Sequence, residues 1–119
     1  MIASTSLSIV SSDLENARRF YGDVLGCALD EVGEEALTAR LPGLELNIEG
    51  GGLPRKRSRR WMEEAGVYVT LHVEDFDAFV SGIAERGGEL LGEPAEGPDG
   101  ERYAGIADPD GLLFEIAGR

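Results

Sequence analysis

The sequence contains few residues of the kinds that form disulfides, span a membrane or bind a metal. Among its 119 residues there is one cysteine, Cys27, and one histidine, His72. A lone cysteine excludes an intrachain disulfide, so a secreted, disulfide-stapled scaffold is not expected. No stretch approaches the roughly 20 apolar residues of a membrane span. The first residues carry no basic segment, so we expect no signal peptide and a cytoplasmic protein.

Positive charge is also scarce. The chain has 11 Lys and Arg residues against 23 Asp and Glu residues, which gives a net charge of -12. Such a surface repels phosphate backbones and acidic membranes, so we expect neither nucleic acid nor a membrane as a partner. Cationic small molecules would be attracted. At this length the chain can bury about two-thirds of its unfolded surface, as one domain.

Self-similarity divides the chain into two halves. Each half contains a short apolar strand, then an acidic start of a helix, then a helix followed by glycine, and each closes on a similar apolar strand. The matches recur in the same order, which indicates two copies of one module. The matched segments are Leu7–Ile9 with Val69–Leu71, Asp13 with Asp75 and Gly26 with Gly88 at a shift of 62 residues, and Leu44–Leu46 with Phe114–Ile116 at a shift of 70.

Two helices are predicted. Ser12 and Glu15 have the spacing of a capping box, in which side chain and backbone satisfy each other's hydrogen bonds. Gly26 can adopt the left-handed conformation that ends such a helix. Apolar residues recur at helical spacing after each start, and we expect them in the core. These residues are Leu14, Ala17, Tyr21 and Leu25 in the first helix, and Phe76, Phe79, Val80 and Ile83 in the second, before Gly87 and Gly88.

The remaining segments read as strands. Asp108 to Gly111 has the sequence Asp-Pro-Asp-Gly, which favours a β-turn and predicts a hairpin of the last two strands. The resulting order, strand, helix and three strands in each half, predicts an α+β fold with mostly antiparallel pairing. The strands are expected near 4–10, 28–33, 36–41, 44–49, 67–73, 89–92, 102–107 and 112–117.

The pattern predicts a single domain made of module one over 1–49, a linker over 50–65 and module two over 66–119. The linker contains a basic run from Arg55 to Arg60, in which five of the chain's 11 basic residues lie. This run is interpreted either as a solvated linker or as an anion contact or flap over a site. A nucleic-acid patch is a weaker interpretation, given the acidic body. Trp61 follows directly, either as a plug between modules or as the wall of a pocket.

The paired modules resemble the vicinal oxygen chelate superfamily, which includes glyoxalase I, extradiol dioxygenases and bleomycin-resistance proteins. The segments that carry the resemblance are Asp13–Glu15 and Phe20–Gly26 in the first half, and Val73–Asp75, Gly87–Gly88 and Ala107–Gly111 running to Phe114–Glu115 in the second. The resemblance implies two βαβββ modules whose strands curve into a cup that holds a ligand. It also implies a homodimer, since many small members pair in this way. These motifs are structural, and they do not identify a reaction.

Metal-dependent relatives bind their ion through one side chain from the first and the last strand of each module. By motif, these positions are Ser6, Glu45, Tyr68 and Glu115. Both carboxylates are present, but serine and tyrosine stand at the two positions where relatives commonly carry histidine. Zinc, nickel and iron favour imidazole, and a catalytic site usually needs three protein ligands. The set therefore predicts no bound metal and no cofactor.

The remaining candidates leave alternatives open. His72 lies four residues beyond Tyr68, roughly 13 Å along a strand, so it is interpreted as structural or as a ligand contact rather than as a metal ligand. Glu45 and Glu115 each interrupt an apolar strand, and alternation turns each toward the cup. They are either paired with Arg40, Arg102 or a tyrosine hydroxyl, or solvated, or they hold a cationic ligand group or act as acid and base.

The favoured function is non-enzymatic binding of a small organic molecule, as in bleomycin-type resistance proteins that sequester an antibiotic. The absent histidines, the acidic body and the aromatic residues Trp61, Tyr68 and Tyr103 favour it, and the ligand is expected to be cationic or aromatic. The alternative is a metal-dependent lyase, isomerase or dioxygenase of the same superfamily. A third is a metal-free enzyme with a glutamate as general base. No catalytic residue is assigned, and the predicted ligand-binding residues are Ser6, Glu45, Trp61, Tyr68, His72 and Glu115.

Overall fold

The computed structural model describes residues 1–53 and 66–119. The chain divides into two compact units, Met1–Pro54 and Arg55–Arg119. The basic run from Arg55 to Arg60 and Trp61 lie outside the described residues, so the interpretations given for them stay predictions. No helix in the described part of the chain is both long and apolar enough to cross a membrane.

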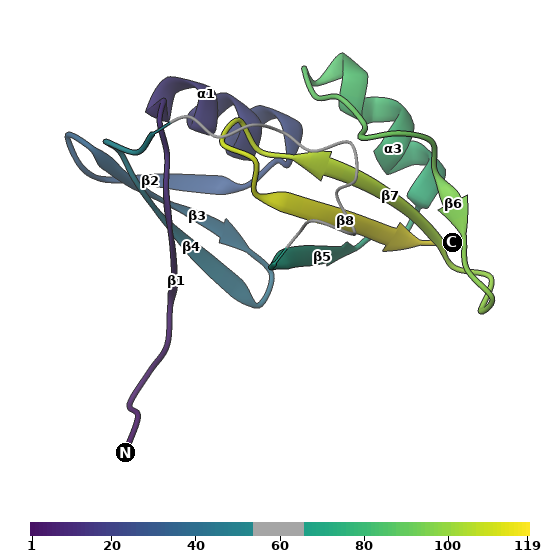
Figure 1. The fold of residues 1–119 in the computed structure, drawn as a ribbon, viewed down its shortest axis with the longest axis horizontal. Helices are drawn as coiled ribbons and strands as arrows, with labels where there is room; N and C mark the ends of the chain where they lie inside the picture. Colours follow the sequence, from purple (N-terminus) through teal and green to yellow (C-terminus); the bar gives the residue numbers. More distant parts are fainter. Residues whose placement is uncertain (54–65) are drawn as a thin grey trace. The chain divides into compact units, whose positions relative to one another are not determined.

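The first unit has the order strand, helix, three strands (Figure 1). Its sheet has the strand order β1-β4-β3-β2, in which β1 is parallel to β4 and the other neighbours are antiparallel. The elements are β1 Leu7–Val10, α1 Leu14–Arg18, the π-helix η1 Arg19–Val24, β2 Ala28–Gly33, β3 Ala36–Leu41 and β4 Leu44–Glu49.

The second unit repeats this topology. Its sheet has the order β5-β8-β7-β6, again with the first and last strands parallel and the rest antiparallel. The predicted α+β fold of two βαβββ modules is therefore confirmed. The elements are β5 Tyr68–His72, α3 Phe76–Glu85, β6 Ala95–Glu96, β7 Arg102–Ala107 and β8 Leu113–Gly118.

Both helices begin at an aspartate. The Asp13 carboxylate accepts a hydrogen bond from the Asn16 N–H, and the Asp75 carboxylate accepts one from the Ala78 N–H. The predicted capping box is wrong, because the N-cap is Asp13 rather than Ser12, so Glu15 does not stand at the third helical position. The N-caps are separated by the 62-residue shift, and the repeat therefore extends to how each helix starts.

The helix ends differ from each other. Gly26 has φ 73°, as predicted for the residue that ends the first helix. In the second module the left-handed residue is Gly87, with φ 92°, and not the matched Gly88. The Gly88 N–H donates to the Ile83 carbonyl, which completes the end of α3.

The first helix is also not the plain α-helix that its apolar spacing predicted. After Arg18 it continues as the π-helix η1, in which the Leu25 N–H donates to the Phe20 carbonyl five residues back. This wider turn buries Phe20, Tyr21 and Val24 together, whereas Leu25 is only half-buried.

One predicted strand is wrong. In the segment 89–92 only Leu90 forms a β-bridge, to Ile106, and the outer strand of the sheet is β6, five residues later. The Asp-Pro-Asp-Gly hairpin is confirmed, since an Asp108 carboxylate oxygen accepts hydrogen bonds from the Asp110 and Leu112 N–H groups. Both acidic side chains of this turn are buried.

The core of each unit lies between the helix and one side of its sheet. Alternation along each strand sends every second side chain to that side. In the second unit the position of α3 identifies this side, because a Cβ built on Gly118 would lie 3.4 Å from Phe76 Cβ. The fully buried strand residues are Leu37, Ala39, Leu46 and Ile48 in the first unit, and Ile106, Phe114 and Ile116 in the second.

Candidate functional site

The candidate side chains that the structure describes lie on the side of each sheet that is turned away from the helix. In β4 the buried Leu46 and Ile48 face the helix, so Glu45 and Asn47 face the other way. In β8 the buried Phe114 and Ile116 face α3, so Glu115 is turned away from it. We call these the distal faces of the two sheets and describe each within its own unit.

The distal face of the first unit is held by charge pairs. Glu45 stands opposite Arg40, and its Oε1 accepts a hydrogen bond of 3.2 Å from Arg40 Nε. Arg40 also forms an ion pair with Asp30. These two carboxylates raise the pKa of the Arg40 guanidinium through hydrogen bonds and charge. Of the alternatives left open for Glu45, the structure therefore shows pairing with Arg40, on an exposed surface.

Ser6 and Glu45 come together in the first unit. Both line an open pocket of about 490 Å³ at the end of β1 and β4, beside the β3–β4 turn at Gly43. Farther along this face, the Thr38 hydroxyl donates to Asn47 Oδ1 at 3.5 Å. The pocket thus offers a hydroxyl and a carboxylate that already has a cationic partner.

The distal face of the second unit has a different centre. Glu115 is buried, at 9% exposure, and its Oε1 accepts a hydrogen bond of 3.3 Å from the Thr70 hydroxyl. Arg102, one of the expected partners of Glu115, instead pairs with Asp77 on the α3 side, where its guanidinium also lies over the Phe76 ring. Within residues 1–53 and 66–119 no ion pair engages Glu115, so its partner is a neutral hydroxyl.

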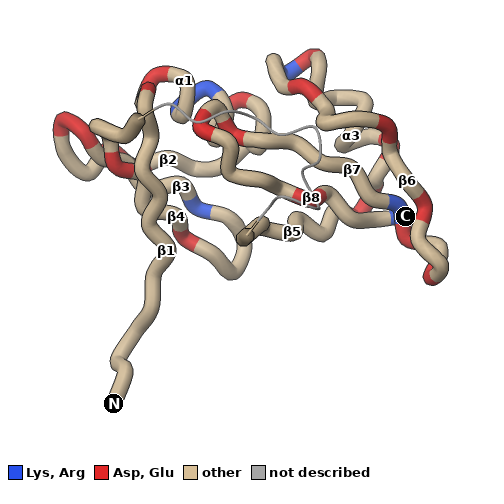
Figure 2. The backbone as a smooth tube through the Cα atoms, viewed as in Figure 1, with Lys and Arg blue, Asp and Glu red and all other residues tan. Residues whose placement is uncertain are grey.

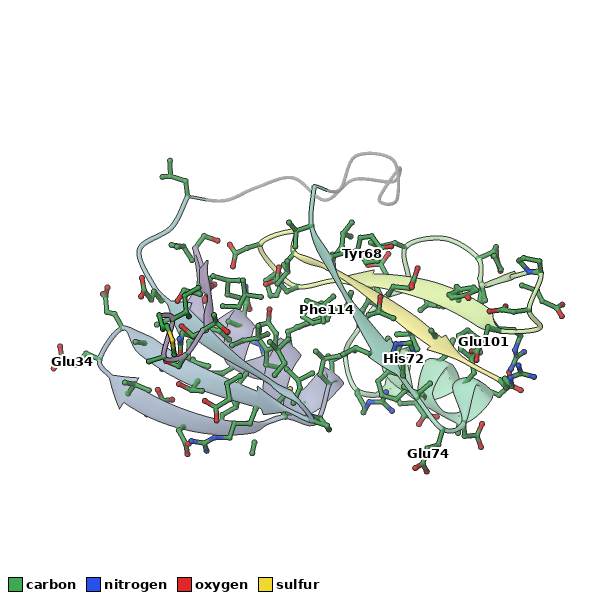
Figure 3. All side chains as sticks on the ribbon, turned by 90° about the horizontal axis from the view of Figure 1, so that it is seen from below. Glu34, Tyr68, His72, Glu74, Glu101 and Phe114 are labelled. Carbon is green, nitrogen blue, oxygen red and sulfur yellow. The ribbon has the colours of Figure 1, made fainter. Side chains whose placement is uncertain are left out.

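Tyr68 and His72 stand at opposite ends of β5, as Figure 3 shows. Both are exposed, and both fall on the same side of the strand as Thr70. His72 lies opposite Ala117, and Tyr68 lies opposite Leu113. Thr70, rather than Tyr68 or His72, is therefore the residue of β5 that lies beside Glu115.

Thr70 was missed from the sequence because strand register was not known. In the first unit Leu7 lies opposite Leu46, which leaves Ser6 next to Glu45. In the second unit Val69, the counterpart of Leu7, lies opposite Phe114. The counterpart of Glu115 is therefore Asn47, and not Glu45 as the 70-residue match suggested. A slip of two residues keeps every side chain on its face, so alternation could not reveal it.

Tyr103 completes the face of the second unit. It lies on β7 opposite Ala117, which puts it diagonally across from Glu115. Its hydroxyl donates to Asp99 Oδ2 at 3.3 Å. Partial burial of the phenol raises the pKa of Tyr103, and the nearby charges of Asp99, Glu101 and Glu115 add to this effect. Tyr103 was named only as an aromatic candidate, because β6 and its turn were not predicted.

Comparison with known proteins extends over nearly the whole chain. Residues 4–116 match the Glyoxalase/Bleomycin resistance protein/Dioxygenase superfamily. The chain belongs to this superfamily. The resemblance inferred from the sequence motifs is therefore confirmed, while the superfamily contains both enzymes and resistance proteins by name.

Among curated relatives, the anthracycline biosynthesis protein DauV of a Streptomyces species is 29% identical over 119 residues, which cover 92% of this chain and 39% of DauV. The protein CFP32 of Mycobacterium bovis is 37% identical over 49 residues, which cover 41% of this chain and 19% of CFP32. This chain thus spans less than half the length of either relative.

Among solved structures, the fosfomycin resistance protein FosX of Listeria monocytogenes has a TM-score of 0.78 at 17% identity, covering 100% of this chain and 95% of that one. A mutant of the same protein was solved with Mn(II) and a dihydroxypropylphosphonic acid, with a TM-score of 0.74, 18% identity and coverage of 98% and 90%. At these identities the likeness shows the fold alone.

In the part of the chain that the structure describes, the residues at the motif positions do not fit a borderline divalent metal such as zinc, nickel or iron. At the four motif positions, Ser6 and Tyr68 offer a hydroxyl and a phenol, and Glu45 is held by Arg40. Across the described ranges, no three His, Cys, Asp or Glu side chains converge in a way that could hold an ion. This donor set is poor for borderline metals, which favour imidazole and thiolate.

Proposed function

We propose that the protein binds a small organic molecule without a metal, on the distal face of the second unit. The observation that carries this proposal is the buried Glu115 carboxylate, whose described partner is the Thr70 hydroxyl. A buried charge without a cationic partner costs free energy, and such groups are common where a ligand completes the pairing. Tyr68 and His72 on the same face supply ring surface for stacking.

The pocket of Ser6 and Glu45 is the second candidate position for a ligand, in the first unit. Its volume of about 490 Å³ is within the usual range for small-molecule sites. Its carboxylate is already paired with Arg40, so a ligand there would have to compete with an existing ion pair. Trp61 remains a predicted contact of the ligand, although it lies outside the described residues.

The test is a thermal-shift screen of cationic and aromatic natural products, followed by titration of each hit through Trp61 fluorescence. We expect Thr70→Ala and Glu115→Gln to weaken a hit at least tenfold, about 1.4 kcal/mol. The matched control is Glu96→Gln, which removes one carboxylate from the α3 side of the same sheet, where Glu96 lies opposite Arg102. A hit whose affinity is unchanged by both Thr70→Ala and Glu115→Gln would contradict the proposed location.

Metal content provides an independent test of the metal-free part. After dialysis against nickel, zinc, manganese and iron, we expect no stoichiometric metal, because Ser6 and Tyr68 stand where a site for such metals usually has better ligands. About one metal per chain, lost on Glu115→Ala, would contradict this and favour a metal-dependent lyase, isomerase or dioxygenase.

We also propose that the protein is a homodimer. Each sheet ends in outer strands, β1 and β2 in one unit and β5 and β6 in the other, and exposed strand edges tend to be covered. Exposed Val10 and Val32 on β1 and β2 add apolar surface near such edges. Sedimentation at micromolar concentration is expected to give twice the chain mass, and a species of 12.7 kDa would contradict the proposal.

A further inference from the structure

We propose that Tyr103, fixed by Asp99 and Gly97, acts with Glu115 to select ligands that carry a protonated amine. The inference rests on the proposed binding function and names the ligand chemistry of the same face. Tyr103 is a recognition residue in this assignment, and its ring and hydroxyl have separate roles.

The strand register brings the participating groups into two neighbouring rows. One row across the sheet contains Thr70, Glu115 and Gly105, and the next contains His72, Ala117 and Tyr103. Gly105 has no side chain and Ala117 has only a methyl group, so small residues adjoin Glu115 on β7 and on the Ala117 side of β8, while Leu113 precedes it on the same face. Neighbouring strands are about 4.8 Å apart, so His72 on β5 and Tyr103 on β7 stand about 10 Å apart, on either side of Ala117.

The turn before β7 fixes the tyrosine ring. A Cβ built on Gly97 would lie 2.8 Å from Tyr103 Cε2, so only glycine lets the ring pack this closely against the backbone. The Gly97 N–H donates to the Glu101 carbonyl at 2.8 Å, which closes the turn. Asp99 Oδ1 accepts from the Glu101 N–H at 2.9 Å, while Oδ2 accepts from the Tyr103 hydroxyl. The ring is therefore positioned before any ligand arrives.

These hydrogen bonds make the face rich in acceptors. Because the Tyr103 hydrogen is donated to Asp99, the lone pairs of the phenol oxygen remain to accept. Burial raises the pKa of Tyr103, and the nearby charges of Asp99, Glu101 and Glu115 add to this effect. Glu115 adds a carboxylate, and Arg102 is turned to the α3 side with Phe76.

A protonated amine matches this arrangement better than a neutral or anionic group does. An ammonium group donates hydrogen bonds to a carboxylate and a phenol oxygen, and its charge is attracted to the face of an aromatic ring. Acidic residues predominate along both units, as Figure 2 shows, which raises the local concentration of cations. A carboxylate in the row next to two rings is thus suited to bind an amine.

The experiment compares benzylamine with benzyl alcohol, which have similar size and differ in charge. Both are titrated to the millimolar range into ¹⁵N-labelled full-length protein, and amide shifts report where each binds and how tightly. We expect benzylamine to shift Thr70, Tyr103 and Glu115 and to bind at least tenfold more tightly than benzyl alcohol. Tyr103→Ala should weaken benzylamine about tenfold, whereas Tyr103→Phe, which keeps the ring, should weaken it about threefold.

The controls separate the parts of the argument. Glu96→Gln, on the other side of the sheet, should leave benzylamine binding unchanged. Equal affinity for the two probes, no response to benzylamine, or an unchanged affinity in Tyr103→Ala would overturn the amine selection. The proposed function would then still stand if a screening hit depends on Thr70 and Glu115. The proposed function would fail separately if the screening hits shift only residues of the first unit.

Discussion

The two sheets share one topology but carry different chemistry on their distal faces. In the first sheet Arg40 lies between Asp30 and Glu45, so charges neutralise one another on an exposed surface. In the second sheet Glu115 is buried and has a hydroxyl for its described partner. Surface pairs of the first kind contribute little to stability, whereas burying a carboxylate without a cationic partner costs folding free energy. This difference in the pairing of the two carboxylates is the reason for placing the proposed ligand site in the second unit.

The largest expected effect on stability comes from truncating buried strand residues, which tests whether the two modules depend equally on their cores. Leu46 on β4 and Phe114 on β8 are counterparts by register, and both are fully buried. We expect Phe114→Ala to cost about 3–5 kcal/mol and Leu46→Ala about 2–5 kcal/mol in urea unfolding, from lost burial and the cavity that remains. Val32→Ala, at an exposed site on β2, should change stability by less than about 0.5 kcal/mol. A loss below about 1 kcal/mol for Phe114→Ala would contradict the core assignment.

A smaller difference in stability between the two modules is expected where the start of each helix packs near the end of the last strand of its module. Gly50 meets Leu14 there, and Gly118 meets Phe76, the residue 62 positions after Leu14. A Cβ on Gly118 would lie 2.7 Å from the Val73 carbonyl oxygen, which is backbone and cannot easily move. A Cβ on Gly50 would meet the movable end of the Leu14 side chain at 3.1 Å.

We therefore expect Gly118→Ala to cost about 1–3 kcal/mol and Gly50→Ala less than about 1 kcal/mol. Gly33→Ala is the control, because nothing lies within 4 Å of its Cβ position and its φ is not positive. It should be neutral or slightly stabilising, by up to about 1 kcal/mol. Equal losses at Gly118 and Gly33 in thermal unfolding would rule out the close approach.

The repeat and the motifs were sufficient to predict the module order, the helices and the terminal hairpin. Those features depend on local signals, such as Asp108 in its turn or Gly26 after its helix, and on alternation, which assigns Glu115 to a face. Strand register is not local. It follows from how β5 and β8 align over 45 residues of separation, and it is what makes Thr70, rather than Tyr68, the neighbour of Glu115.

Two other errors have the same kind of cause. In the π-helix Phe20 and Tyr21 are both buried with their rings edge to face, an arrangement that simple helical spacing does not predict. The strand at β6 is two residues long and is placed by its pairing with β7, while its own composition is typical of a loop. Tyr103 was undervalued for this reason, because its partners Gly97 and Asp99 belong to a turn that only β6 defines.

The N-caps of the two helices are expected to contribute equally to the stability of the protein. Asp13 and Asp75 each accept a hydrogen bond from the N–H three residues on. We expect Asp13→Ala and Asp75→Ala each to cost about 1 kcal/mol in chemical unfolding, because one helix N–H loses its partner. Conversion of Asp75 to Asn, which can still cap, should cost much less. A loss at only one of the two positions would show that the repeated cap is not energetically equivalent.

The smallest effect concerns the exposed ion pairs between helix and sheet, Arg18–Glu31 in the first unit and Arg102–Asp77 in the second. A hydrogen bond from Arg18 lowers the pKa of Glu31 below its ordinary value of 4.5, against a weaker opposing effect of burial. A lowered pKa in the folded state stabilises the protein above the unfolded value, and this is lost as the pH falls through the folded pKa. The Tm difference between wild type and Arg18→Ala should therefore be small at neutral pH and shrink further below about pH 4.5.

Arg19→Ala is the matched control, because Arg19 donates to the neutral Asn16 amide, so its Tm difference should not depend on pH in that window. A Tm difference for Arg18→Ala that stays constant down to about pH 3 would show that Arg18 does not stabilise the protein through the charge of Glu31.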